Sequence, residues 1–198
     1  MPTDDDNPGP PHERRKKFVT RLYKLGDSLD SANQYEVANA RKILARLRRG
    51  LTDDRYAMHG FELLLPYKVL ETQERHCLLV AGLFALNPTT ARKDEQRWSL
   101  CAALADAGSS GSADARARQL IAATEVGGTA YRLRQAVQLI GGAQKRMPLD
   151  FESLLTDLIR LDADETTARK VRLRWARDFQ HRVHTRDTSS GKEAKATS

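Results

Sequence analysis

The sequence predicts an all-α protein made of two small helical bundles. Apolar residues recur every three or four positions through most of the stretch between residues 13 and 183, which is the spacing of amphipathic helices. The sequence has no sustained alternation of apolar and polar residues and no Asn-Gly hairpin signal, so strands have little support. The segment GSSGS at residues 108–112 is typical of a flexible linker. We therefore expect two helical lobes joined near residue 110.

The N-terminal lobe is expected over residues 13–107, after a disordered arm at residues 1–12 that lacks apolar periodicity. Its first helix places Phe18, Leu22 and Leu25 on one face, and its second ends at a glycine that suits a helix C-terminus. The third is apolar on all sides in its second half, which predicts burial at the centre of the lobe. The expected helices are 13–26, 31–50, 72–86 and a weaker one at 95–107.

The C-terminal lobe is expected over residues 113–184, before a disordered tail at residues 185–198. Asp150 is a good N-cap for the apolar segment that starts at Phe151. The acidic segment DADET precedes the last helix, where negative charge complements the helix dipole. The expected helices are 113–125, 129–145, one that starts after Asp150, and a last one that runs to about residue 183.

Composition is that of an ordinary globular protein with an excess of positive charge. A chain of 198 residues buries roughly 70% of its extended surface on folding, so it needs neither a metal nor a disulfide. The excess of 33 Lys and Arg over 26 Asp and Glu favours a polyanionic partner. Cys77 and Cys101 lie in apolar stretches, as the reduced thiols of cytosolic proteins do. With no signal peptide and no apolar run long enough to span a bilayer, we expect a soluble cytoplasmic protein that does not enter a membrane.

No catalytic, metal or cofactor site is predicted. The sequence contains neither a glycine-rich nucleotide-binding loop nor the HExxH zinc signature. DADET at residues 162–166 resembles the start of a calcium loop, but Thr167 and Leu173 stand where that loop needs glycine and glutamate. His76 lies beside an apolar run and is expected to be structural. An enzyme is therefore the least favoured class.

Basic stripes on two helices are the features that suggest function. In the last helix, Val171, Trp175 and Phe179 share one face at helical spacing and should be core. A helix face that only meets solvent would more often interleave glutamate with lysine, but Asp178 is the one acid in this stretch. The basic residues on its two flanks are Arg169, Lys170, Arg172 and Arg174.

A second stripe follows the helix at 31–50, and further basic positions are scattered along the chain. Because exposed aromatics for base stacking are scarce, these residues favour contact with the phosphate backbone without sequence reading. Two alternatives remain open: a helix-turn-helix with Gly127-Gly128 as its turn, and a structural adaptor whose charge aids solubility. The candidates are Arg46, Arg48 and Arg49 of the stripe, together with Arg75, Arg132, Arg134, Lys145, Arg146 and an arm at Arg14–Lys17.

The order of several segments resembles a known family. The segments are LARLRRGL, ERHCLLVAGLFALNP, YRLRQAVQLI, PLDFESLLTDLIRLD and VRLRWARDFQ. In this order and spacing, the chain from about residue 14 to residue 183 resembles the small subunit of the type I-E CRISPR surveillance complex, Cascade. The resemblance implies a non-enzymatic, all-helical protein that pairs with a second copy of itself within the complex and touches the backbone and large subunits.

The resemblance also implies nucleic-acid partners and a set of contact residues. The partners would be the CRISPR RNA and the target and non-target DNA strands, which such subunits stabilise while the R-loop forms. The residues that would fall on the basic surface of the family are Arg48 or Arg49, Arg75, Arg132, Arg134, Arg169, Lys170 and Arg172.

Overall fold

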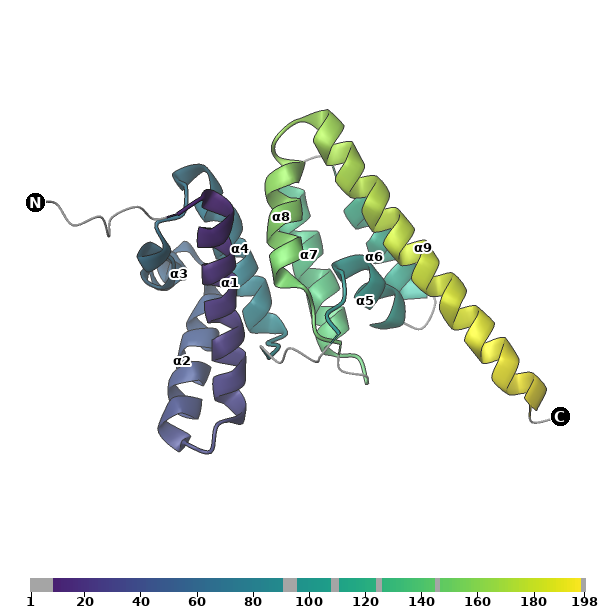
Figure 1. The fold of residues 1–198 in the computed structure, drawn as a ribbon, viewed down its shortest axis with the longest axis horizontal. Coiled ribbons are helices and arrows are strands. Elements are labelled where there is room, and N and C mark those ends of the chain that lie inside the picture. The colour runs from purple at the N-terminus through teal and green to yellow at the C-terminus, as the bar shows by residue number, and fades with distance from the viewer. Residues whose placement is uncertain (1–8, 91–95, 108–110, 124–125, 145–146, 197–198) are drawn as a thin grey trace, which may run out of the picture. The chain divides into compact units, whose positions relative to one another are not determined.

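A computed structural model describes residues 9–90, 96–107, 111–123, 126–144 and 147–196 (Figure 1). Within these ranges the chain is helical, and its extended backbone pairs only in one isolated bridge, between Trp98 and Leu149. The prediction of an all-α fold is confirmed. The α-helices are α1 (Pro11–Asp27), α2 (Gln34–Gly50), α3 (Ala57–Leu64), α4 (Glu71–Leu86), α5 (Leu100–Ala107), α6 (Gly111–Ile121), α7 (Val126–Gly141), α8 (Phe151–Leu161) and α9 (Glu165–Ala196).

The chain divides into two compact units, and each unit draws on two separate stretches of sequence. The first unit is Met1–Glu95 with Phe151–Ile159, and the second is Gln96–Asp150 with Arg160–Ser198. These bounds differ from the single division that the sequence suggested near residue 110, because most of α8 packs in the first unit. Of the expected linker, residues 108–110 lie outside the described ranges, and Gly111 already begins α6.

Aromatic packing explains why α8 joins the first unit. The ring of Phe151 lies 5.2 Å from that of Phe84 in α4, edge against face. The buried backbone N–H of Phe151 donates a 2.9 Å hydrogen bond to the hydroxyl of Tyr23 in α1. That bond satisfies one of the donors that a helix N-terminus leaves unpaired. The second half of α4 is buried on all sides, as the sequence predicted.

Backbone contact at one glycine fixes how closely α1 approaches the segment after α4. A Cβ atom on Gly26 would overlap the carbonyl oxygen of Thr89, so only glycine fits there. Cys77 of α4 is fully buried and carries a free thiol, whose pKa burial raises to about 12. Cys101 of α5 is also buried and forms no disulfide, in line with the two reduced thiols that the sequence predicts.

The second unit is organised around α9. Val171, Trp175 and Phe179 are buried on one face of that helix, as the spacing predicted. Asp164 caps its start by accepting a 2.9 Å bond from the N–H of Thr167, and the hydrogen bonds from Thr167 lower the pKa of that carboxyl. None of the described helices is both long and apolar enough to cross a membrane.

The helix α9 continues to Ala196, where the sequence suggested a disordered tail from residue 185. Two arginines hold it against α5. Arg182 donates a 2.8 Å hydrogen bond from Nε to Asp106, and its guanidinium lies 4.4 Å from the centre of the Trp98 ring. Arg186 donates a 2.8 Å bond to the carbonyl of Ala105, in the last turn of α5. These contacts, which sequence periodicity does not reveal, lie at the point where the predicted helix ended.

Candidate nucleic-acid interface

At the end of α2, one predicted contact residue is engaged inside the molecule. The Nε and Nη2 atoms of Arg48 donate hydrogen bonds of 3.2 Å and 2.7 Å to the carbonyl oxygen of Ala85. Because α4 ends at Leu86, that carbonyl is one that the helix leaves without an internal partner. A cation at this end also complements the helix dipole. Arg48 therefore caps α4, although it is exposed, and Arg46, two residues earlier, is half-buried.

In the first unit, Arg75 lines a groove, and Arg49 lies over the ring of Tyr56, which lines the same groove. The guanidinium of Arg49 lies 5.3 Å from the centre of the Tyr56 ring, within the range of a cation–π interaction. Tyr56 lines a groove of about 250 Å³ that is otherwise mainly apolar, with Leu47, Leu51 and Leu78 among its walls. The exposed Arg75 of α4 also lines it. Arg49 thus contacts one wall residue of the groove, and Arg75 is part of its lining.

At the start of α9, the four predicted residues differ in how accessible they are. Arg169 and Lys170 are exposed. Arg172 has a side chain only 16% exposed, and its Nη1 pairs with Glu165 at 2.8 Å. Arg174 is half-buried. A phosphate could reach the first two directly, whereas Arg172 would have to leave its carboxylate partner first.

On α7, the predicted Arg132 and Arg134 are half-buried, and an exposed aromatic lies next to them. Tyr131 is 64% exposed, and its hydroxyl accepts a 2.7 Å hydrogen bond from the side chain of Gln135. The expectation that exposed aromatics are scarce therefore missed Tyr131, although Trp175 and Phe179 are core as expected. Lys145 and Arg146 lie outside the described residues.

The structure does not contain the turn that the helix-turn-helix alternative requires at Gly127-Gly128. Helix α7 begins at Val126, so Gly127 and Gly128 lie in its first helical turn and not between two helices. The sequence predicts them instead between a helix that ends near residue 125 and one that starts near residue 129.

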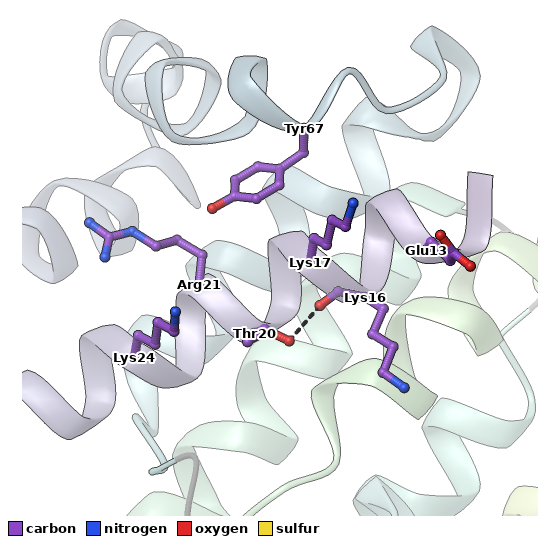
Figure 2. Close-up of a pocket in the computed structure, with 7 residues that line it drawn as sticks. All are labelled: Glu13, Lys16, Lys17, Thr20, Arg21, Lys24 and Tyr67. Carbon is purple, nitrogen blue, oxygen red and sulfur yellow. Dashed lines mark hydrogen bonds between the residues drawn. The ribbon is translucent and has the colours of Figure 1, made fainter. Parts of the chain in front are cut away.

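A larger basic groove lies on α1, most of which sequence reasoning missed (Figure 2). It has a volume of about 580 Å³. The sequence indicated an arm at Arg14–Lys17 but not its continuation through Arg21 and Lys24. The signal was present, because Lys17, Arg21 and Lys24 follow the i, i+4, i+7 spacing that places residues on one face of a helix. The residues that line the groove are Glu13, Lys16, Lys17, Thr20, Arg21, Lys24 and Tyr67.

The other two arginines of that arm hold the groove together. Arg14 donates a 2.8 Å hydrogen bond from Nη1 to the carbonyl of Lys68, and Arg15 donates a 2.9 Å bond to the side chain of Gln73. The first bond ties α1 to the residue after the short 3-10 turn Leu65–Tyr67, and the second ties it to the first turn of α4. The ring of Tyr67 also meets that of Phe18 in α1, edge against face at 5.9 Å. Tyr67 is therefore held above the basic face of α1.

The cations of the α1 groove differ from Arg48 and Arg172 in having no internal partner among the described residues. Within these ranges, the side chains of Lys17, Arg21 and Lys24 make no hydrogen bond or ion pair. In Figure 2, all three reach to the side of α1 on which Tyr67 lies, and Lys16 points away. At about 1.5 Å of rise per residue, the three charges extend over roughly 10 Å of helix.

Groups of three or more side chains that could hold a metal ion do not occur in the described ranges. What the surface offers is positive charge beside exposed or half-buried tyrosines. This combination suits binding of an anionic polymer more than acid–base or metal chemistry.

Comparison with known proteins identifies the family. The sequence pattern of the family described as CRISPR-associated protein Cse2 matches residues 43–179, more than half of the chain. The chain belongs to the Cse2 family. The resemblance seen in the sequence is thereby confirmed. No curated protein matches the chain.

Solved structures with the Cse2 fold agree. CasB from Thermus thermophilus is 27% identical, with a TM-score of 0.59, and the match covers 87% of this chain and 99% of that one. CasB from M. ruber is 26% identical, with a TM-score of 0.60 and coverage of 89% and 98%. A chain of a structure described as a CRISPR RNA-guided surveillance complex is 22% identical, with a TM-score of 0.64 and coverage of 90% and 98%, and supports the fold alone.

Proposed function

We propose that this Cse2-family chain is a non-catalytic, sequence-independent nucleic-acid-binding subunit of a CRISPR RNA-guided surveillance complex in the cytoplasm. The observation that carries the proposal is a set of exposed cations in a Cse2-family fold, on α1, α4 and the start of α9. The proposed partners are the CRISPR RNA, the target and displaced DNA strands, the backbone and large subunits, and a second copy of the chain.

The chemistry of such a subunit is electrostatic. Lysine and arginine that neutralise phosphates release counterions, so binding weakens steeply as salt rises. The cations with least internal engagement, such as Arg169 and Lys170, would hold the backbone without reading bases. Binding to the chain alone is expected to be weak, because neighbouring subunits would complete the binding surface in the assembly. Stabilising the separated strands in this way would favour formation of the R-loop.

The test is single-stranded DNA binding across a salt series, with two charge-matched double variants. Removing Arg169 and Lys170 together to alanine should weaken binding and reduce the salt slope by about 1.4, at roughly 0.7 per phosphate contact. The matched control replaces Arg55 and Arg118, which pair locally with Asp53 and Asp114. Equal affinities and equal salt slopes for the wild type and both variants would refute the proposal.

A further inference from the structure

We infer that Tyr67 and the basic face of α1 form a site for single-stranded nucleic acid, in which one base stacks on Tyr67 while phosphates follow Lys17, Arg21 and Lys24. This inference rests on the proposed function and deepens it, since it adds base stacking to a surface proposed to bind only phosphates. A groove of about 580 Å³ lies within the range of sites that hold small organic groups.

Contacts within the first unit position Tyr67 at the groove. It ends the 3-10 turn Leu65–Tyr67, and the next residue, Lys68, adopts a left-handed backbone conformation with a φ of 46°. Lysine rarely takes this conformation, which costs free energy and persists where surrounding contacts enforce it. Here Arg14 donates a hydrogen bond to the Lys68 carbonyl, and the Lys68 N–H donates to the carbonyl of Leu65. These contacts brace the turn that carries Tyr67, and packing against Phe18 holds its ring at the groove.

Lys17, Arg21 and Lys24 lie where they could contact the phosphates next to a base that is stacked on Tyr67. Figure 2 shows Lys17 and Arg21 on either side of the Tyr67 ring, with Lys24 following along the helix. Base stacking on aromatic side chains beside a positive groove is the usual mode of single-strand binding. At the other end, the carboxylate of Glu13 would repel phosphate, so the strand is expected to run from Lys17 toward Lys24.

A single strand fits this arrangement better than a duplex or an acidic protein segment. In a duplex the base faces are covered by their neighbours, so Tyr67 would have no partner. An acidic peptide would use the three cations but would leave the tyrosine ring without a role. Both alternatives therefore predict that Tyr67 is dispensable, which makes it the residue to test.

The experiment is photo-crosslinking of the full chain to an oligothymidine that carries one 5-iodouracil. A base stacked on Tyr67 should give a crosslink within the peptide that contains this residue. Lys17→Ala, Arg21→Ala and Lys24→Ala together should remove the crosslink. In a binding assay, Tyr67→Leu should weaken affinity for oligothymidine about fivefold or more, Tyr67→Phe should preserve it, and an abasic strand of equal length should bind all three proteins alike.

The contrary outcomes separate this inference from the proposed function. Salt-sensitive binding that depends on Arg169 and Lys170, with crosslinks only outside the Tyr67 peptide, would overturn the stacking site and leave the proposed function standing. Failure of the strand to bind at any salt concentration would overturn both. Equal displacement of the strand by a polyglutamate peptide of the same charge would favour a protein partner and overturn the inference. The crosslink uses the unaltered protein, so it does not depend on how the variants fold.

Discussion

Two sets of basic residues look alike in the sequence but differ in what their charges contact. One set lies on α1, and the other lies at the end of α2 and near the start of α9. Arg48 and Arg172 are bound to groups of the protein itself, a helix-end carbonyl and a carboxylate. Lys17 and Lys24 point into a groove and have no such partner in the described ranges. Charge in a sequence is therefore not the same as charge available to a ligand.

The chemistry of the two side chains accounts for part of this difference. The guanidinium group of arginine has five donors in a rigid fork and is weakly hydrated, so it readily satisfies carbonyls and carboxylates within a fold. The ammonium group of lysine is strongly hydrated and sits on a flexible stem. Accordingly, Arg14, Arg48 and Arg186 each donate to a backbone carbonyl at or just after the end of another helix.

The largest expected effect follows from removing the unengaged charges. Replacing Lys17, Arg21 and Lys24 with alanine should lower single-stranded DNA affinity at least tenfold and reduce the salt slope by about 2, because three phosphate contacts are lost. The matched control removes Arg55, Arg116 and Arg118, which contact local partners. Fluorescence anisotropy across a salt series measures both quantities. If the control lost as much affinity, net charge alone would determine binding, and the position of the cations on α1 would not matter.

The next effect is on stability, and it concerns Arg182, the arginine whose carboxylate partner is largely buried. Arg182→Ala should lower the free energy of unfolding by about 2 kcal/mol, because it strips the partner from Asp106, whose side chain is only 11% exposed. It should also alter the emission of Trp98, on which Arg182 stacks. Urea unfolding followed by tryptophan fluorescence measures both. Arg177→Ala, an exposed position on the same helix, is the control and should change neither.

Arg48 offers the same test in the first unit with a smaller effect. Arg48→Ala should cost about 1–2 kcal/mol of unfolding free energy, since the Ala85 carbonyl loses two charged donors. Strand binding should weaken no more than in Lys42→Ala, an exposed neighbour on α2 whose removal should leave stability unchanged. If Arg48→Ala proves as stable as the wild type and binds DNA poorly, Arg48 belongs to the interface and not to the cap of α4.

Sequence periodicity predicted what depends on local spacing and missed what depends on distant partners. It placed Val171, Trp175 and Phe179 on one buried face and predicted the burial of α4. It omitted α3, and it placed α8 with the segments next to it in sequence. The partners of Phe151 are Tyr23 and Phe84, more than 60 positions away, and no local pattern reports them.

The candidate site divides in the same way. Helical spacing placed Arg169 and Lys170 on the flanks of the last helix, where the structure exposes them, and the same spacing relates Lys17, Arg21 and Lys24 on α1. Tyr67 could not be found from spacing, because it ends a proline-containing turn, and the next residue, Lys68, is bonded by Arg14, 54 positions earlier. Sequence position also says nothing about which arginines find a carbonyl or a carboxylate nearby.

Arg172 gives the smallest expected effect, and for this residue the family resemblance and the structure disagree. The family resemblance implies that it contacts nucleic acid, whereas the structure pairs it with Glu165 and leaves only 16% of its side chain exposed. On the structural argument, Arg172→Ala should change strand affinity less than twofold and leave the salt slope within error, while Arg169→Ala lowers both. Glu165→Gln separates the two explanations further. If Arg172 becomes a phosphate ligand only when released, Glu165→Gln should strengthen binding in the wild type but not in Arg172→Ala, and that pattern would return Arg172 to the interface.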